Sequence, residues 1–298
     1  MAGQGRDPVA SVTLGRDAEL GALFGLLDAA GGGVPATVLL RGEPGSGKTH
    51  LMTALAHEAR ASGWVVLSAI GVESEMVLPG SGLLSLLGPL RDDLSTLPGA
   101  QAAALASALG WGEPAQVRAD RFLVGAATLA LLSAAAARGP VLVTVDDLQW
   151  VDDESADALA FASRRLVHDR VAMVFTQRDG ARLAARMAGI DVIELDGLSA
   201  GPARELLGSG FSTEVAARLA AETAGNPLAL VECRRVMGQA QRTGAAPLPP
   251  TLPVPERLRA VFVDELAALA PGAWRAATLC AALADADLAP VPAALGDE

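Results

Sequence analysis

The chain has 298 residues, 51% of them hydrophobic and 19% charged, which predicts a globular protein long enough for a sizeable core and about two domains. Its net charge is −11, and an acidic chain lacks the clustered cations that phosphate contacts need, so no direct DNA contact is expected from this stretch. The two cysteines and three histidines give neither a disulfide framework nor a zinc-ligand pattern.

No segment of the sequence predicts export or membrane insertion. Residues 1–10 contain no apolar signal region, and residues 122–137 form a strongly apolar, uncharged run. That run is shorter than the roughly 20 residues of a membrane span, and Arg121 and Arg138 bound it. We expect a buried, alanine-rich helix there, no membrane partner, and a cytoplasmic protein.

Apolar periodicity predicts alternating helices and strands over the first 200 residues. The predicted strands are residues 36–40, 64–70, 140–150, 171–178 and 191–195. The predicted helices are residues 16–30, 50–63, 120–137 and 154–167, with short irregular helices over residues 79–111. Several strands are apolar throughout, which indicates an α/β fold with a parallel sheet covered by helices on both faces.

The pattern changes after residue 200, where only helices are predicted, at residues 199–207, 212–225 and 227–239. Five prolines in residues 244–256 then indicate an extended linker. We therefore predict four regions: an α/β domain at 1–198, a helical subdomain at 199–243, the linker at 244–256, and a further helical region at 257–298.

The residues that follow the first predicted strand form a phosphate-binding loop. The stretch is Gly42, Glu43, Pro44, Gly45, Ser46, Gly47, Lys48 and Thr49, which matches G-x-x-x-x-G-K-[ST] between a strand and a helix. Its glycines let backbone N–H groups surround phosphate oxygens, and the helix N-terminus adds a partial positive charge. We expect a P-loop NTPase in which Lys48 reaches the β- and γ-phosphates, Thr49 binds Mg²⁺, and His50 lies beside the nucleotide.

Lys48 is the only lysine of the chain, since the other 22 of its 23 basic residues are arginine. Lysine is a compact point charge on a thin stem, whereas arginine is a broad planar fork. Inside a closed loop of backbone amides we expect only the slim ammonium to fit. A coding bias toward arginine could also explain why lysine is absent elsewhere.

Two acids stand at the end of the buried strand "VLVTVDDLQW". In open α/β sheets, ligands bind at the carboxyl ends of the strands. We predict that Asp146 holds Mg²⁺, directly or through water, and that Asp147 acts as base or orienter for the attacking water.

Two weaker motifs follow. In "FTQRD", Thr176 and Arg178 end another strand at the same edge, where an arginine could sense the γ-phosphate or neutralise transition-state charge. In "GNPLAL", Gly225 suits the position after a helix, Asn226 an N-cap and Pro227 the first helical turn.

The motifs, taken in order, resemble a known family. "GRDAEL", "GEPGSGKT", "VLVTVDDLQWVDDES", "FTQRD", "LDGLSAGPARELL" and "GNPLALVE" look like the ATPase core of the large ATP-binding LuxR-type transcriptional regulators. These regulators belong to the signal-transduction ATPases with numerous domains (STAND), a branch of the AAA-like P-loop proteins. The resemblance runs from about residue 12 to about residue 290. The Walker motifs are generic, whereas "DDLQWVDDES" together with "GNPLALVE" is more specific.

The resemblance implies an ATP-driven switch, in which an ADP-bound resting form exchanges to ATP when an inducer binds and the ATP form self-associates. It implies that Gly15 and Arg16 lie near the adenine, that Pro227 packs against the base, and that Arg178 senses the γ-phosphate. Trp150, Asp152, Asp153 and Ser155 would complete the acidic strand-to-helix loop. Family members continue with a winged helix, helical repeats and a DNA-binding helix-turn-helix. Residues 257–298 resemble only the opening of the winged helix, which is expected of a fragment or a truncated reading frame.

Two other functions remain open. A remodelling motor of the AAA type would need a ring and an arginine supplied in trans, for which Arg164 and Arg165 are the suggestive pair. A nucleotide-dependent binding module would hydrolyse ATP negligibly. A small-molecule kinase is less well supported, because no acceptor-pocket motif is visible.

Overall fold

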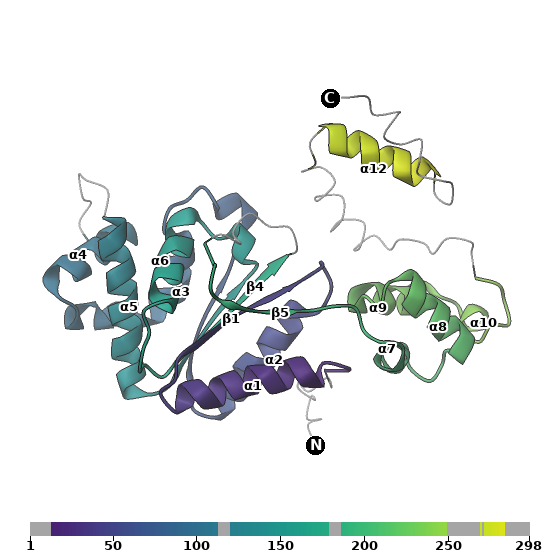
Figure 1. Cartoon of the computed structure of the whole chain (residues 1–298), viewed down its shortest axis with the longest axis horizontal. Coiled ribbons are helices and arrows are strands. Elements are labelled where there is room, and N and C mark those ends of the chain that lie inside the picture. Colours follow the sequence, from purple (N-terminus) through teal and green to yellow (C-terminus); the bar gives the residue numbers. More distant parts are fainter. Residues whose placement is uncertain (1–12, 113–119, 179–185, 249–268, 270, 284–298) are drawn as a thin grey trace, which may run out of the picture. The chain divides into compact units, whose positions relative to one another are not determined.

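The computed structural model describes residues 13–112, 120–178, 186–248, 269 and 271–283 (Figure 1). The chain divides into two compact units, Met1–Ala203 and Arg204–Glu298. This division falls within helix α7 (Ala200–Leu207), a few residues after the predicted boundary at residue 198.

The first unit is built on a parallel sheet. Its strands are β1 (Ala36–Gly42), β2 (Val65–Ile70), β3 (Val141–Asp146), β4 (Val171–Arg178) and β5 (Asp191–Glu194), in the order β2-β3-β4-β1-β5. Every neighbouring pair is parallel, which confirms the predicted fold class. The order places β4 at the centre, between β3 and β1, and because these strands are parallel the loops that follow them open at the same edge of the sheet.

Helices cover both faces of the sheet (Figure 1). α1 (Asp17–Gly31) and α2 (Lys48–Ala61) lie on one face; α3 (Ser81–Leu87), α5 (Arg121–Arg138) and α6 (Asp153–Ser163) lie on the other, with α4 (Gly99–Ala108) packed on α5. Short 3₁₀ turns are η2 (Glu73–Glu75), η3 (Gly88–Thr96) and η4 (Leu148–Trp150).

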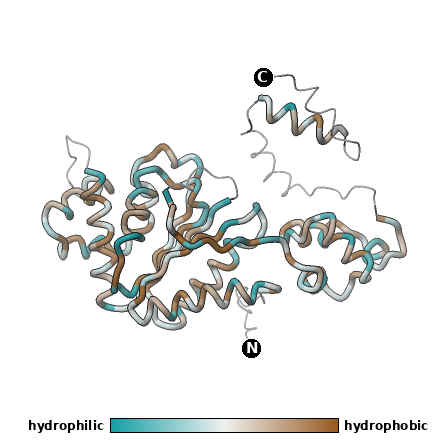
Figure 2. Tube along the Cα trace, viewed as in Figure 1, coloured by the Kyte–Doolittle hydropathy of each residue, from teal (hydrophilic) through white to brown (hydrophobic). Residues whose placement is uncertain are grey.

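Strand alternation explains the two faces. On β1, Leu39 packs into the cluster of α3 to α6, whereas Val38 and Leu40 pack with α1 and α2. β3 and β4 carry apolar side chains on both faces, so much of the sheet is brown in Figure 2. Burial on both sides is what makes these strands continuously apolar in the sequence.

The apolar helix α5 belongs to this core. By length and composition it could cross a membrane, and among the described residues it is the one helix of that kind. Its Leu131 and Leu132 are fully buried among side chains of the sheet and the neighbouring helices, and Asp120 caps its N-terminus by accepting the Phe122 N–H at 2.8 Å. The predicted buried, alanine-rich helix is confirmed on this inward face.

The predicted helices 212–225 and 227–239 end three residues early, at Glu222 and Val236, and two other predicted elements end four residues early. The strand predicted over residues 140–150 stops at Asp146, because Asp147 adopts a left-handed conformation with φ 49° and turns the chain into η4. The helix predicted to reach residue 167 ends at Ser163, where Arg164 is the C-cap. In both places apolar periodicity continues past the point where the backbone leaves its regular conformation.

The second unit is helical where it is described. Beyond the end of α7 it contains α8 (Thr213–Glu222), α9 (Pro227–Val236), α10 (Gln239–Arg242) and α12 (Pro271–Leu283). The Asn226 side chain accepts the N–H groups of Leu228 and Ala229, so its predicted N-cap role is confirmed, as is Pro227 in the first turn. The predicted linker from residue 249 onward, and the winged-helix start apart from residue 269 and α12, lie outside the described residues.

Candidate functional site

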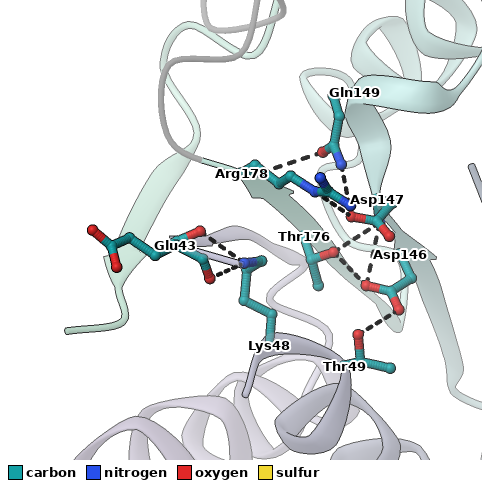
Figure 3. A network of polar contacts seen from close by, with 9 residues as sticks. Glu43, Lys48, Thr49, Asp146, Asp147, Gln149, Thr176 and Arg178 are labelled. Carbon is teal, nitrogen blue, oxygen red and sulfur yellow. Dashed lines mark hydrogen bonds and ion pairs between the residues drawn. The ribbon is translucent and has the colours of Figure 1, made fainter. Parts of the chain in front are cut away.

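The motif residues of the first unit meet at the carboxyl edge of the sheet. In the β1–β4 register Gly42 pairs with Arg178, so the phosphate-binding loop begins beside the end of β4. β3 lies on the other side of β4 and ends at Asp146. Figure 3 shows Asp146, Asp147, Thr176 and Arg178, from the ends of β3 and β4, close to Thr49 at the start of α2. The strand order therefore assembles the site that the sequence predicted from separate motifs.

The loop after β1 presents the N-terminus of a 14-residue helix. Gly47 is the N-cap of α2 at φ 103°, a conformation in which a side chain would be strained. Gly47 has no side chain, so the N-cap residue itself does not satisfy the first N–H groups of α2. The Ser46 hydroxyl is buried in the same loop and has no hydrogen-bond partner among the residues that the structure describes. Backbone N–H groups at a helix N-terminus are groups that bind phosphate.

Lys48 lies inside this loop and is 7% exposed. Its ammonium donates to the carbonyl oxygens of Gly42, at 2.7 Å, and Glu43, at 2.9 Å. Glu43 takes part here through its backbone, since its side chain is exposed. A narrow ammonium with several donors suits a position between two loop carbonyls. The guanidinium of arginine is broader, which is consistent with lysine at this position.

A chain of hydrogen bonds joins α2 to β3 and β4. The Thr49 hydroxyl donates to Asp146 Oδ2 at 2.8 Å, and the fully buried Thr176 hydroxyl donates to Asp146 Oδ1 at 2.5 Å. The Thr176 oxygen also accepts the Asp147 N–H at 2.8 Å. Thr176 therefore fixes both acids at once, and it holds Asp147 in its left-handed conformation.

The Asp147 side chain has two partners. The Gln149 amide donates to Asp147 Oδ1 at 2.6 Å, and Arg178 Nε lies 3.7 Å from the same oxygen. Gln149 also accepts the backbone N–H of Arg178 at 3.3 Å, and the Arg178 guanidinium lies 5.8 Å from the centre of the Trp150 ring. The predicted base and the predicted sensor thus lie in one cluster (Figure 3).

Arg16 reaches the loop from the start of α1 and is 6% exposed. Its guanidinium donates to the carbonyls of Ser46, at 3.0 Å, and Asp196, at 2.5 Å, and pairs with Glu19 at 2.8 Å. Gly15 precedes it at φ 66°, and a side chain there would come within 2.5 Å of Pro202. Arg16 therefore links the phosphate-binding loop to the segment that follows β5. Its predicted place near an adenine stays a prediction.

Asp152 and Ser155, in the second half of the loop between β3 and α6, have a structural role. Asp152 is 2% exposed and accepts the N–H groups of Gly80, Gly82 and Ser155 at 2.8 to 3.0 Å, with the Ser81 hydroxyl at 3.3 Å. Ser155 accepts the Leu83 N–H at 2.9 Å. Together they cap α6 and α3.

Asp153 is exposed and forms an ion pair with Arg186, which also lies 3.3 Å from Asp157. The hydrogen bond to the Asp153 carboxylate raises the pKa of the Arg186 guanidinium above its ordinary value. This pair lies on the surface of α6, away from the hydrogen bonds that join Asp146 and Asp147 to the phosphate-binding loop.

The other predicted site residues are placed as follows. His50 is exposed on α2, with Nε2 3.3 Å from the Thr13 hydroxyl, and Pro44 and Gly45 are half-buried in the loop. Pro227 is half-buried and begins α9 in the second unit. Its role at the nucleotide therefore stays a prediction.

The residues present fit a nucleotide and magnesium. The unpartnered Ser46 hydroxyl, the uncapped helix end and Lys48 offer donors and charge to phosphates, while Thr49 and Asp146 offer hard oxygen ligands. Within the described residues no group of three or more His, Cys, Asp or Glu could hold a metal ion by itself. Mg²⁺ is typically held by one or two carboxylates together with phosphates and water, and Asp146 could supply such a carboxylate.

Gln149 is the site residue that sequence reasoning missed. Its position two residues after Asp147, within a loop of acids, is the available signal. The amide reaches Asp147 only because that residue is left-handed and folds the chain into η4. Sequence pattern does not predict that conformation for a non-glycine residue.

A family model described as "AAA ATPase domain" matches residues 13–174, which is more than half of the chain. The chain therefore belongs to the AAA ATPase domain family. The match contains the phosphate-binding loop and both strand-end acids, so nucleotide binding, typically with Mg²⁺, is implied by the family.

Individual relatives are distant. An uncharacterized protein of Rhizobium meliloti (strain 1021) is 30% identical in an alignment over 195 residues, and the match covers 55% of this chain and 18% of that protein. The structure of Drosophila ORC bound to DNA is similar at 12% identity with a TM-score of 0.50, over 99% of this chain and 81% of that one. This likeness shows a shared fold.

A STAND protein with a tetratricopeptide repeat sensor from Pyrococcus horikoshii is also similar. It is 17% identical with a TM-score of 0.48, over 89% of this chain and 34% of that one.

Proposed function

We propose that this chain is an ATP-binding, slowly hydrolysing switch module of a signal-responsive regulator of the LuxR type, acting in the cytoplasm. One observation carries the nucleotide part: Lys48, the Ser46 hydroxyl and the uncapped start of α2 converge in one loop, with Asp146 and Asp147 beside it. The regulatory part is supported by the order of the motifs and their resemblance to the ATPase core of those regulators. An inducer and nucleotide-dependent self-association belong to the same proposal.

Each residue has a defined task in this proposal. Lys48 and the N–H groups at the start of α2 would bind the phosphates of ATP or ADP. Thr49 and Asp146 would hold the magnesium ion, which supplies charge neutralisation at the phosphate oxygens. Asp147 would orient a water molecule and take its proton. Its side chain is 31% exposed, so a water molecule can reach the carboxylate. Arg178 would neutralise negative charge on the transferred phosphate.

The slow rate follows from the same contacts. One Asp147 oxygen already accepts the Gln149 amide and lies near Arg178. Arg178 thus lies beside Asp147, whereas neutralising charge on a transferred phosphate would require it beside the phosphate. We therefore expect low turnover unless Arg178 moves from Asp147 toward the phosphate, which suits a switch better than a metabolic enzyme.

A remodelling motor is less well supported. Arg164 donates to the Arg186 carbonyl at 3.0 Å, and the Arg165 guanidinium lies 3.7 Å from the centre of the Phe161 ring. Both arginines are engaged within their own chain. A binding module with negligible hydrolysis differs from the proposal in its turnover alone.

Binding of MgATP to Lys48→Ala tests the proposal. Removing the ammonium should weaken MgATP binding at least about 100-fold, because a charge-assisted contact to the phosphates is lost. Titration calorimetry on the whole chain measures it. Lys48→Arg should fail similarly if the compact ammonium is required.

Arg60→Ala provides the matched control, because it removes one cation from the last turn of the same helix. Its dissociation constant should equal that of the unmodified chain. Unchanged MgATP affinity in Lys48→Ala would remove the phosphate-binding role from the loop. Unchanged affinity in Lys48→Arg would refute the compact-ammonium argument alone.

A further inference from the structure

Gln149 uses both ends of its side-chain amide within the site. Nε2 donates to Asp147 Oδ1 at 2.6 Å, and Oε1 accepts the backbone N–H of Arg178 at 3.3 Å. The orientation of the amide is determined by its partners, since a backbone N–H can only donate and an ionised carboxylate can only accept. Gln149 therefore links Asp147, expected to act on the attacking water, to Arg178, expected to act on the γ-phosphate.

The two oxygens of Asp147 are not equivalent. Oδ1 is held by Gln149 and lies near Arg178, whereas within the described part of the chain no donor is recorded for Oδ2. A carboxylate with one oxygen fixed has a single orientation for the other. Oδ2 is thus the oxygen left to accept a proton from water.

The two partners of Oδ1 differ in how firmly they are held. Arg178 approaches through a long side chain, at 3.7 Å, and that side chain is 26% exposed. Gln149 is anchored to the backbone of Arg178, which is fixed in the sheet by its pairing with Gly42. If Arg178 turns toward a phosphate, the Gln149 contact with Asp147 can persist, because it depends on the strand and not on the guanidinium.

We propose that Gln149 is a positioning residue for hydrolysis: it ties Asp147 Oδ1 to the end of β4 and leaves Oδ2 as the oxygen that accepts the proton of the attacking water. This inference rests on the proposed ATPase function. Gln149 touches neither the phosphates nor the metal in this scheme, so it acts through the geometry of Asp147. Its loss should lower the rate of hydrolysis and leave nucleotide affinity unchanged.

Single-turnover hydrolysis of MgATP by the whole chain tests the proposal, with the dissociation constant for MgATP measured on the same preparations. Gln149→Met keeps the length of the side chain and removes both hydrogen bonds. Its hydrolysis rate should fall about tenfold, the effect of losing one hydrogen bond to a charged group, with affinity within twofold. Gln149→Glu can still accept the Arg178 N–H but cannot donate to an ionised Asp147, so its rate should fall at least as far.

Gln101→Met is the control, because it removes a glutamine amide from α4, outside the site, and should leave both quantities unchanged. A Gln149→Met rate equal to that of the unmodified chain overturns the inference, as does a normal rate in Gln149→Glu. Loss of affinity in step with rate would show a general structural role and also overturns it. Failure of the proposed function looks different: the unmodified chain would then hydrolyse no ATP above the Lys48→Ala background.

Discussion

The acidic loop between β3 and α6 has two halves that use the same residue type in opposite ways. Asp146 and Asp147 lie at the sheet edge, and their partners come from the phosphate-binding loop helix, β4 and η4. Asp152, five residues further on, is buried and accepts four donors from α3 and α6. The first half is arranged around a ligand site, whereas the second joins two helices.

The comparison shows that the number of hydrogen bonds a carboxylate already accepts within the chain separates a structural acid from a functional one. Asp152 has every expected hydrogen bond made within the chain, so no capacity is left for a ligand. Asp147 keeps an oxygen for which the described residues provide no donor, and it is 31% exposed. Both kinds of acid occur within residues 146–155, so their spacing in the sequence does not separate them.

The largest effect is expected from Asp147→Asn, which changes the functional half of the loop and should lower the rate of ATP hydrolysis. The amide keeps the shape of the carboxylate but cannot take a proton from water, so single-turnover hydrolysis should fall by roughly 10³-fold while MgATP binding persists. Asp153→Asn is the matched control, because Asp153 is an exposed acid of the same loop whose ion pair with Arg186 is worth little at the surface. Equal hydrolysis in Asp147→Asn and the unmodified chain would remove Asp147 from its role.

Asp152→Ala changes the structural half of the loop and should destabilise the fold. Removing the carboxylate leaves the N–H groups of Gly80, Gly82 and Ser155 without their acceptor and uncaps α6, so the free energy of unfolding should fall by about 3 kcal/mol. Denaturant unfolding measures this change. Hydrolysis per folded molecule should stay within twofold of the unmodified value, and a loss of hydrolysis without a loss of stability would reverse the assignment of the two halves.

Much of the fold was predictable because its periodicity is strong. β4 was predicted over residues 171–178 and forms over the same residues, since its run of apolar side chains is buried on both faces. The strand order was not predictable, because the pairing of β1 with β4 depends on contacts far apart in the chain. The end of β3 was missed because it rests on the left-handed backbone of one aspartate, Asp147.

The site was predictable where a motif carries its own mechanism. Lys48, Thr49 and Asp146 lie together as the phosphate-binding pattern implies. Gln149 and the capping role of Asp152 were not predictable, because each depends on a partner supplied by another element of the fold. Arg16 illustrates the same limit, since its contacts with the carbonyls of Ser46 and Asp196 come from loops distant in sequence.

Amide hydrogen exchange of the whole chain, with and without MgATP, tests the contrast between the two halves most directly. The uncapped start of α2 should gain protection when phosphates bind its N–H groups, at Gly47, Lys48 and Thr49. The N–H groups of Gly80 and Gly82 should be unchanged, because Asp152 already accepts them. Protection that appears at Gly80 and Gly82 while the phosphate-binding loop stays unchanged would contradict the account.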